Sequence, residues 1–362
     1  MQSKLIFFFL SAFILFSCGV EDEEPADEVT DNDNDSVQFE TPDFEESGDE
    51  TDKTEDDISE KPDDLPEYFC YSGGAVLYEG EQQFKMCPGD SKQVLKQICK
   101  NGKWIDEGDC IPSYVTIPEG DFKMGCDIEK EKTCEGDNTP LHSIVLSEFI
   151  IEKFEVNVER YEECIAAGAC NNENPEGPHY RTTDDSYSCN IGNSERKNHP
   201  ANCVTWHGAK AFCQWIEMDL PTEAQWEKAA RGAAAPIYPW GDSPEPDCDY
   251  AVMKTVSAGC GNGVTYPIGT TPKGASEYGL FDMSGNVSEY VLDWYEKNFY
   301  SDEEATKKDT LGPDEPQYDK FKVCRGGSYL YDERRTRAAF RSSCKFNDAA
   351  IDFGFRCATD KK

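Results

Sequence analysis

Histidine is scarce in this sequence, with four residues in 362. His142, His179, His199 and His207 form no H-x-x-x-H or H-E-x-x-H pair, so a histidine metal site could arise only through the tertiary fold. The G-x-S-x-G turn that exposes a nucleophilic serine is absent as well. Neither a helix-borne histidine metal centre nor a hydrolase nucleophile is therefore indicated.

Positive charge is also low. The chain has 35 Lys and Arg against 72 Asp and Glu, a net charge of −37, which argues against nucleic acid or an anionic lipid surface as a partner. Residues 21–70 alone hold 23 acidic and 2 basic residues and few apolar ones. This composition predicts a disordered acidic tether over residues 19–66. Calcium buffering or recruitment of a partner is the alternative role.

The N-terminus has no apolar run long enough to span a membrane. Residues 5–16 are apolar but too few for a transmembrane helix. They end in Leu15-Phe16-Ser17-Cys18, which resembles the lipobox of bacterial lipoproteins. We therefore predict a signal peptide over residues 1–18 and lipidation of Cys18, with an ordinary secretory signal as the alternative. Gly19 in place of Asp favours an outer-membrane anchor and a periplasmic or cell-surface location.

Cysteine, in contrast, is abundant. Of the 17 cysteines, 16 remain after Cys18, an even number in an exported chain. Four of them lie in residues 67–111, for which we predict a small β module with two disulfides: Cys70, Cys87, Cys99 and Cys110. A four-cysteine metal site is the alternative, but no C-x₂-C pair is present. The end of the segment, with Trp104, resembles the last strand of a sushi module.

Local patterns predict the elements that follow. Residues 114–124 and 141–151 alternate in polarity like strands. Asn157 is placed to cap a helix over residues 158–167, and Thr205 to cap one that runs to Ile216. Thr222 and Gln225 form a capping-box pattern for a helix that begins at Glu223. Regular periodicity fades beyond this helix.

Four motifs carry a family resemblance. They are LPTEAQWEKAARG at 220–232 with YPWG at 238–241, YGLFDMSGNVSEY at 278–290, RGGS at 325–328 and GFRC at 354–357. In this order they resemble the formylglycine-generating enzyme (sulfatase-modifying factor) family over residues 114–360. The resemblance implies an α+β, irregular, C-type-lectin-like domain over residues 112–362.

The resemblance also implies a disulfide between Cys213 and Cys357. A second family bridge would join the positions of Ala230 and Ala338, and both of its cysteines are absent. Ten cysteines are left, for which we predict local loops: Cys126–Cys134, Cys164–Cys170, Cys189–Cys203, Cys248–Cys260 and Cys324–Cys344.

The family's enzymes hold copper with two cysteines after RGGS and use it to oxidise a substrate cysteine. Here Tyr331 stands at the first position, and the shorter segment has no equivalent of the second, so copper is not expected. Ser328 matches a pocket serine, which we interpret as structural. The charged stretch 332–337 is either a solvated loop or the rim of an anion- or peptide-binding site.

Calcium is the cofactor that the resemblance favours. The family's ligands map onto the side chains of Asp282 and Glu289 and the carbonyls of Gly285 and Val287, an oxygen set suited to Ca²⁺. A second family site would use Asp249 and the carbonyl of Tyr250. Ser288 stands where active enzymes carry Trp.

The sequence therefore predicts a non-catalytic recognition domain for a protein, peptide or glycan ligand. The alternative from another class is an oxidoreductase of the formylglycine-generating type, with a recruited metal or with Cys324 and Cys344 as a reducible pair. A third possibility is a maturation factor for exported sulfatases without chemistry of its own.

Overall fold

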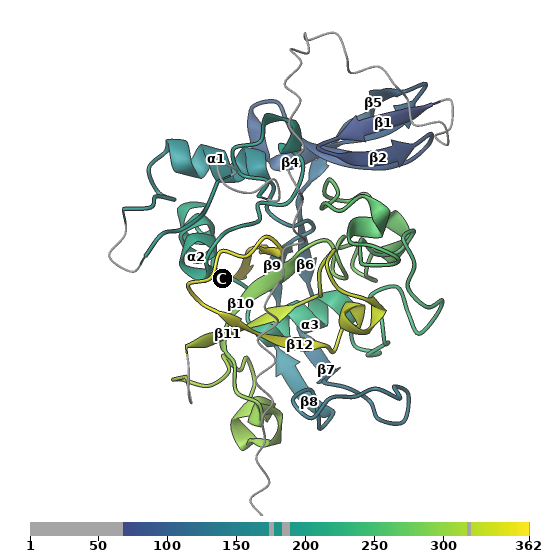
Figure 1. The fold of residues 1–362 in the computed structure, drawn as a ribbon. Coiled ribbons are helices and arrows are strands. Elements are labelled where there is room, and N and C mark those ends of the chain that lie inside the picture. The colour runs from purple at the N-terminus through teal and green to yellow at the C-terminus, as the bar shows by residue number, and fades with distance from the viewer. Residues whose placement is uncertain (1–67, 174–176, 183–188, 317–319, 362) are drawn as a thin grey trace, which may run out of the picture. The chain divides into compact units, whose positions relative to one another are not determined.

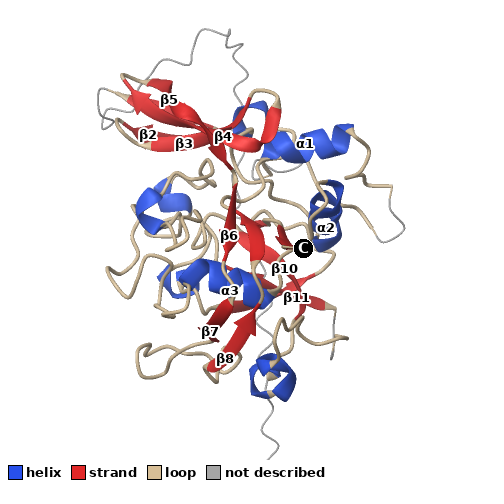
Figure 2. Ribbon diagram, turned by 180° about the vertical axis from the view of Figure 1, so that it is seen from behind, coloured by secondary structure: helices blue, strands red, loops and turns tan. Residues whose placement is uncertain are grey.

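The computed structural model describes residues 68–173, 177–182, 189–316 and 320–361. These residues belong to one compact unit, residues 61–362. They form the predicted α+β fold, with many short strands, few helices and long loops (Figure 1, Figure 2). The predicted signal peptide and tether, Cys18 included, lie outside the described residues. In the described part, no helix combines the length and the apolar character that crossing a membrane requires.

The first strands are β1 (Phe69–Ser72), β2 (Ala75–Tyr78), β3 (Gln82–Cys87), β4 (Asp90–Lys100) and β5 (Lys103–Pro112). The later strands are β6 (Tyr114–Ile117), β7 (Gly120–Met124), β8 (His142–Leu146), β9 (Phe149–Glu152), β10 (Ser288–Trp294), β11 (Phe321–Arg325), β12 (Arg341–Lys345), β13 (Phe353–Gly354) and β14 (Ala358–Asp360). The α-helices are α1 (Val158–Ala166), α2 (Trp206–Trp215) and α3 (Glu223–Arg231). Short 3₁₀ helices are η1 (Ser194–Arg196), η2 (Gly259–Gly261), η3 (Pro272–Gly274), η4 (Phe299–Ser301), η5 (Glu303–Thr306) and η6 (Glu333–Thr336).

Strands β1–β5 form the N-terminal module. β1 and β2 make an antiparallel hairpin, and β3, β4 and β5 make an antiparallel sheet in that order. Cys70–Cys99 joins the hairpin to β4, and Cys87–Cys110 joins β3 to β5. A core of this size depends on such cross-links to stay folded.

The module shares its core with the rest of the unit. The Phe84 ring lies 4.7 Å from the Phe154 ring and 5.5 Å from the Phe281 ring, measured between centroids. The Phe84 amide donates to the carbonyl of Ile268. At the other end of the module, His199 contacts the Ser72 carbonyl through Nε2 at 2.9 Å. The module therefore packs against the larger domain as part of the same folded unit.

The two strand patterns at 114–124 and 141–151 each form two strands. β6 pairs with β9 and β7 pairs with β8, in one continuous antiparallel register. The ladder is interrupted at Pro118, which has no amide hydrogen to donate. Across from it, the Ser147 amide and hydroxyl both donate to the Asp309 carboxylate. The prediction of single strands was therefore wrong at this break.

The predicted helix starts are confirmed. Asn157 accepts a hydrogen bond from the Arg160 amide, and Thr205 accepts one from the Gly208 amide. Thr222 and Gln225 form the reciprocal capping box at the start of α3. Because each cap satisfies amides that have no partner within the helix, the sequence fixes where the helices begin.

The C-terminal half is built around a four-stranded sheet in the order β12-β11-β10-β13, in which only β13 runs parallel to its neighbour. Helix α3 lies against β7, β10 and β11 (Figure 1). Trp226 is fully buried beneath this sheet. The edges of β10 and β12 line the cavity described below.

Six further disulfides cross-link the rest of the described unit: Cys126–Cys134, Cys164–Cys170, Cys189–Cys203, Cys213–Cys357, Cys248–Cys260 and Cys324–Cys344. They are the same six pairs that the sequence analysis names. Ala230 and Ala338, where the family's second bridge would be, are both fully buried in one hydrophobic cluster. Packing there takes the place of a covalent link.

The shared core gives a test. Phe84→Ala is expected to lower the free energy of unfolding by roughly 3–5 kcal/mol, because the lost ring leaves a cavity. Tyr78→Ala, in the same module but at a side chain 47% exposed, should change it by less than about 0.5 kcal/mol. Urea unfolding followed by fluorescence and circular dichroism should show one transition. Separate transitions for module and domain would contradict a shared core.

Candidate binding site

A cavity of about 340 Å³ opens beside the central sheet. It lies between β10, β12, β13 and the segment that follows the RGGS motif. Its lining combines serine hydroxyls, aromatic rings and charged groups: Asp137, Ser288, Tyr295, Tyr331, Arg335, Phe340, Arg341, Ser342, Ser343, Cys344 and Phe353. The volume suits a small molecule or one or two side chains of a peptide.

Tyr331, at the predicted position of the missing copper cysteine, is part of this lining. Its amide donates to the carbonyl of Ser328, and its carbonyl accepts from the amide of Lys254. Burial raises the pKa of the Tyr331 phenol, so the side chain stays neutral at physiological pH. A neutral phenol cannot replace a thiolate as a ligand for Cu(I).

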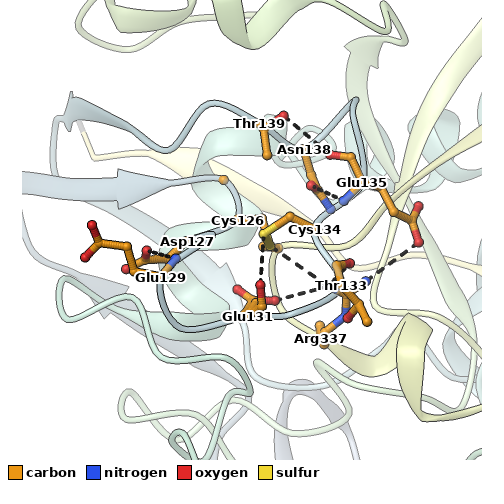
Figure 3. The surroundings of a disulfide bond; sticks show 12 residues. Cys126, Asp127, Glu129, Glu131, Thr133, Cys134, Glu135, Asn138, Thr139 and Arg337 are labelled. Carbon is orange, nitrogen blue, oxygen red and sulfur yellow. Dashed lines mark hydrogen bonds and ion pairs between the residues drawn. A yellow bond between two sulfur atoms is a disulfide. The ribbon is translucent and has the colours of Figure 1, made fainter.

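The charged stretch 332–337 divides into three roles. Arg334 is exposed and pairs locally with Asp332. Arg337 is buried and donates to Glu131 at 3.2 Å and to the carbonyl of Thr133 at 2.7 Å, in the loop closed by Cys126–Cys134 (Figure 3). Only Arg335 turns to the cavity. Neither alternative, a solvated loop or the rim of a binding site, therefore describes the whole stretch.

Arg335 lies against two aromatic rings. Its guanidinium carbon is 3.8 Å from the centroid of Tyr331 and 5.5 Å from that of Phe340. Among the described carboxylates, none forms an ion pair with it, although its charge partly offsets the burial that raises the pKa of Asp352. A stacked guanidinium of this kind keeps its donors available for a ligand.

Ser328 has a structural place. It is fully buried, its hydroxyl donates to Asp352 at 3.0 Å, and it accepts from the amide of Leu330 at 3.3 Å. These bonds hold the turn that carries Tyr331. They agree with the interpretation of Ser328 as part of the scaffold.

No thiol is available beside the cavity. Cys324 on β11 and Cys344 on β12 form a disulfide, and Cys344 is part of the lining. All sixteen cysteines in the described part of the chain are paired in disulfides. The residues there consequently offer no pair of thiolates for copper.

Beneath the cavity lies a buried ionic network. Arg341 donates to both carboxylate oxygens of Glu223, at 2.6 and 2.9 Å, and to the carbonyl of Asp137 at 2.7 Å. Burial alone would raise the pKa of Glu223, but Arg341 and Arg325 lower it below its usual value. Arg341 is therefore committed to the protein, which leaves Arg335 as the cation with free capacity.

One helical turn further along α3, Glu227 accepts from Arg325, from Arg231 at 3.1 Å and from the amide of Gly125 at 2.8 Å. The spacing of Glu223 and Glu227 puts both carboxylates on one face of α3. This face points to the arginines of β11 and β12. Sequence analysis did not single out these residues, since acidic residues in a helix are usually exposed.

The side chains do not fit the complete calcium site that the resemblance implies. Glu289 accepts from Arg356 through both oxygens, each at 2.7 Å, and from the Trp226 indole at 2.9 Å. Asp282 accepts from the Gly269 amide at 2.7 Å and from Thr271 at 3.4 Å. Over the described ranges, no group of three or more His, Cys, Asp or Glu side chains could hold a metal ion.

The second predicted calcium site is no better arranged. Asp249 is exposed and pairs with Lys273. Tyr250 packs its ring 5.0 Å from that of Trp240. These contacts place both residues in an ordinary surface loop.

Glu155 was not among the predicted site residues, and it is buried near Asp282 and Glu289. It accepts from the Asn286 side chain at 2.7 Å and from the Val287 amide at 3.1 Å. Burial, with Asp282 and Glu289 as further causes, raises its pKa well above the usual value. A single Glu between apolar Phe154 and Val156 was the only signal.

None of the described histidines is part of the cavity lining. His199 is buried and bonded at both ring nitrogens, to Thr265 and to the Ser72 carbonyl. Burial lowers its pKa to about 3, so it stays neutral. His142 contacts the Pro140 carbonyl at 3.0 Å. Each of these two has a structural role.

Comparison with known proteins agrees with this geometry. The family profile of the sulfatase-modifying factor enzyme 1-like domain matches residues 106–361. The chain belongs to this family. A formylglycine-generating enzyme of Streptomyces coelicolor is 31% identical over 290 residues, covering 68% of this chain and 88% of that protein.

Other members of the family differ in activity. A protein of Bos taurus named inactive C-alpha-formylglycine-generating enzyme 2 is 25% identical over 72% of this chain and 92% of its own. Among solved structures, PvdO from Pseudomonas aeruginosa matches with a TM-score of 0.54 and 22% identity over 68% of this chain and 94% of that one. The structural match supports the fold.

The ionic network gives a second test. Glu227→Gln removes the charge that faces Arg231 and Arg325 and should lower the free energy of unfolding by about 3–5 kcal/mol. Glu119→Gln breaks an exposed pair with Lys308, whose side chains are 62% and 51% exposed, and should cost less than about 1 kcal/mol. Urea unfolding measures both. Equal effects of the two variants would show that the buried network contributes no more than a surface pair.

Asp282 gives a pH test. Burial raises its pKa to about 6, above the value of about 3.9 in an unfolded chain. Between these values the folded state holds a proton that the unfolded state has lost, so Asp282 reduces stability as pH rises from about 4 to about 6. With a chelator present, the free energy of unfolding of Asp282→Asn minus that of the natural protein should therefore increase by roughly 2–3 kcal/mol as pH rises from about 4 to about 6.

The calcium prediction is tested by the same pair of proteins. At pH 7, Ca²⁺ should raise the melting temperature of the natural protein and leave that of Asp282→Asn unchanged if Asp282 is a ligand. Equal melting temperatures with and without Ca²⁺ in the natural protein would reject a structural ion there.

Proposed function

We propose that this chain is a cell-envelope lipoprotein whose sulfatase-modifying-factor-like domain binds a ligand in the cavity at Tyr331 and does not oxidise cysteine. The observation that carries the proposal is that Tyr331, at the position the resemblance gives to the first copper cysteine, lines the cavity, while Cys324 and Cys344 nearby are joined in a disulfide. Family members differ in activity, as the names of the two relatives show. Fold alone does not decide the chemistry.

The membrane part of the proposal rests on the sequence at Leu15–Cys18 and on the acidic segment that follows. A lipid on Cys18 would anchor the chain, and the acidic segment would hold the folded domain away from the membrane. The strongly negative charge supports a protein, peptide or glycan ligand over nucleic acid. Calcium is proposed on the family resemblance, with Asp282 rather than Glu289 as its side-chain ligand, since both oxygens of Glu289 are bonded to Arg356.

The catalytic part is tested directly. The full-length protein, loaded with Cu(I) in oxygenated buffer, is expected to leave a Cys-x-Pro-x-Arg peptide unchanged, because it has no thiolate pair to bind copper. Mass spectrometry of the peptide measures conversion of its cysteine to formylglycine. The Streptomyces coelicolor enzyme is the positive control. Repeated turnover by this chain would refute the proposal.

The oxidoreductase alternative predicts a different result. If Cys324 and Cys344 were a reducible pair, mild reductant and an alkylating reagent would label them before the seven other disulfides of the domain and the module. We expect no such preference, since both sulfurs are almost fully buried. Selective labelling of this pair would favour the alternative.

A further inference from the structure

Arg335 is the cation of the cavity that forms no ion pair with another described residue. Arg341, which lines the same space, already binds both oxygens of Glu223. Arg337, two residues further on, is bonded to Glu131 and to the Thr133 carbonyl. Within the residues that the structure describes, Arg335 has ring contacts but no ion pair. A half-buried guanidinium without an anion is costly unless something supplies one.

Hydrogen bonds within η6 and a ring contact hold Arg335 in place. Asp332 caps the start of η6, and its side chain accepts from the Arg334 amide. The Arg335 amide donates to the Asp332 carbonyl, and the guanidinium lies over Tyr331 at 3.8 Å. A planar guanidinium that rests on an aromatic ring loses little further entropy when it binds a planar partner.

The neighbouring groups restrict the partner. Asp137 lines the same cavity, and one of its carboxylate oxygens is buried without a hydrogen bond. A dianion such as a phosphate monoester would meet this second negative charge, whereas a carboxylate brings one charge and matches one guanidinium in bidentate geometry. Ser288, Ser342 and Ser343 also line the cavity, and a serine hydroxyl can both donate and accept a hydrogen bond.

The aromatic side chains of the cavity restrict the chemistry of the ligand further. Phe340 and Phe353 line the space together with Tyr331. Ser288 contributes only a small side chain to this lining. An apolar or aromatic group next to the carboxylate would therefore be buried with it.

We propose that Arg335 is the carboxylate-binding residue of the cavity, and that the ligand is a monocarboxylate attached to an apolar or aromatic group. The inference rests on the proposed function and specifies its ligand class. Such a carboxylate could belong to a free aromatic acid or to the C-terminal residue of a peptide, and the chemistry at Arg335 is the same for both.

The test uses N-acetyl-phenylalanine, its amide, and a tripeptide that ends in a free Phe carboxylate. Ligand-observed NMR and equilibrium dialysis with the full-length protein measure binding. We expect the free acid to bind with a Kd on the order of 1 mM or tighter, given its size. The amide should bind at least roughly tenfold more weakly, because it lacks the charge. Tighter binding of the tripeptide would identify a peptide terminus as the source.

Three variants locate the effect. Arg335→Met keeps an apolar side chain next to Tyr331 but removes the guanidinium. It should weaken binding of the acid by roughly 10- to 100-fold. Arg335→Lys should retain part of the affinity, since it keeps charge without bidentate geometry. Arg334→Met, in the same turn but exposed and paired with Asp332, is the matched control and should bind like the natural protein. Melting temperatures verify that all three are folded.

The outcomes separate this inference from the proposed function. No binding of any carboxylate at 20-fold the expected Kd, equal binding of acid and amide, or unchanged binding by Arg335→Met would each overturn it, while the absence of cysteine oxidation would stand. Copper-dependent oxidation of the cysteine peptide would instead overturn the proposed function. Binding of the acid that is lost in Arg335→Met alone would support the inference.

Discussion

The structure depends on the two carboxylates that α3 presents to the interior. Glu223 and Glu227 are one turn apart, and they bind arginines from β11, from β12 and from α3 itself. A buried charge without a partner would cost several kcal/mol, so helix and strands must meet in one arrangement only. The capping box at Thr222 fixes the residue at which α3 begins, and this start determines the direction in which the two carboxylates point. Because Arg341 of β12 binds Glu223, β12 and the cavity wall that it forms are positioned by the same helix.

Charge balance distinguishes three places in the domain. Around α3, acidic and basic side chains match closely. Around Arg356 there is an excess of carboxylates, and their burial raises the pKa values of Glu155 and Asp282. In the cavity, Arg335 forms no ion pair with a described residue, although the carboxylate of Asp137 lines the same space. Of these three places, only the one at Arg335 faces an open space, and for that reason it points to a ligand from outside.

Much of the fold could be read from the sequence because its signals are local. Capping residues fix the starts of the helices, and the family motifs fix the order of the elements. The interruption at Pro118 was missed because the polarity pattern continues across it. The role of Arg335 could not be separated from that of Arg334 or Arg337, since the three differ only in what the fold places against them. Likewise, nothing local shows that Glu289 binds Arg356.

The disulfides have a consequence for the order of assembly. Seven bridges close loops of 6 to 29 residues, so each can form soon after its second cysteine is made. Cys213 pairs with Cys357, 144 residues later and a few residues from the C-terminus. Cys213 therefore stays without its partner until the chain has been made as far as Cys357. A chain that stopped before Cys357 would keep Cys213 as a thiol able to pair wrongly with another cysteine.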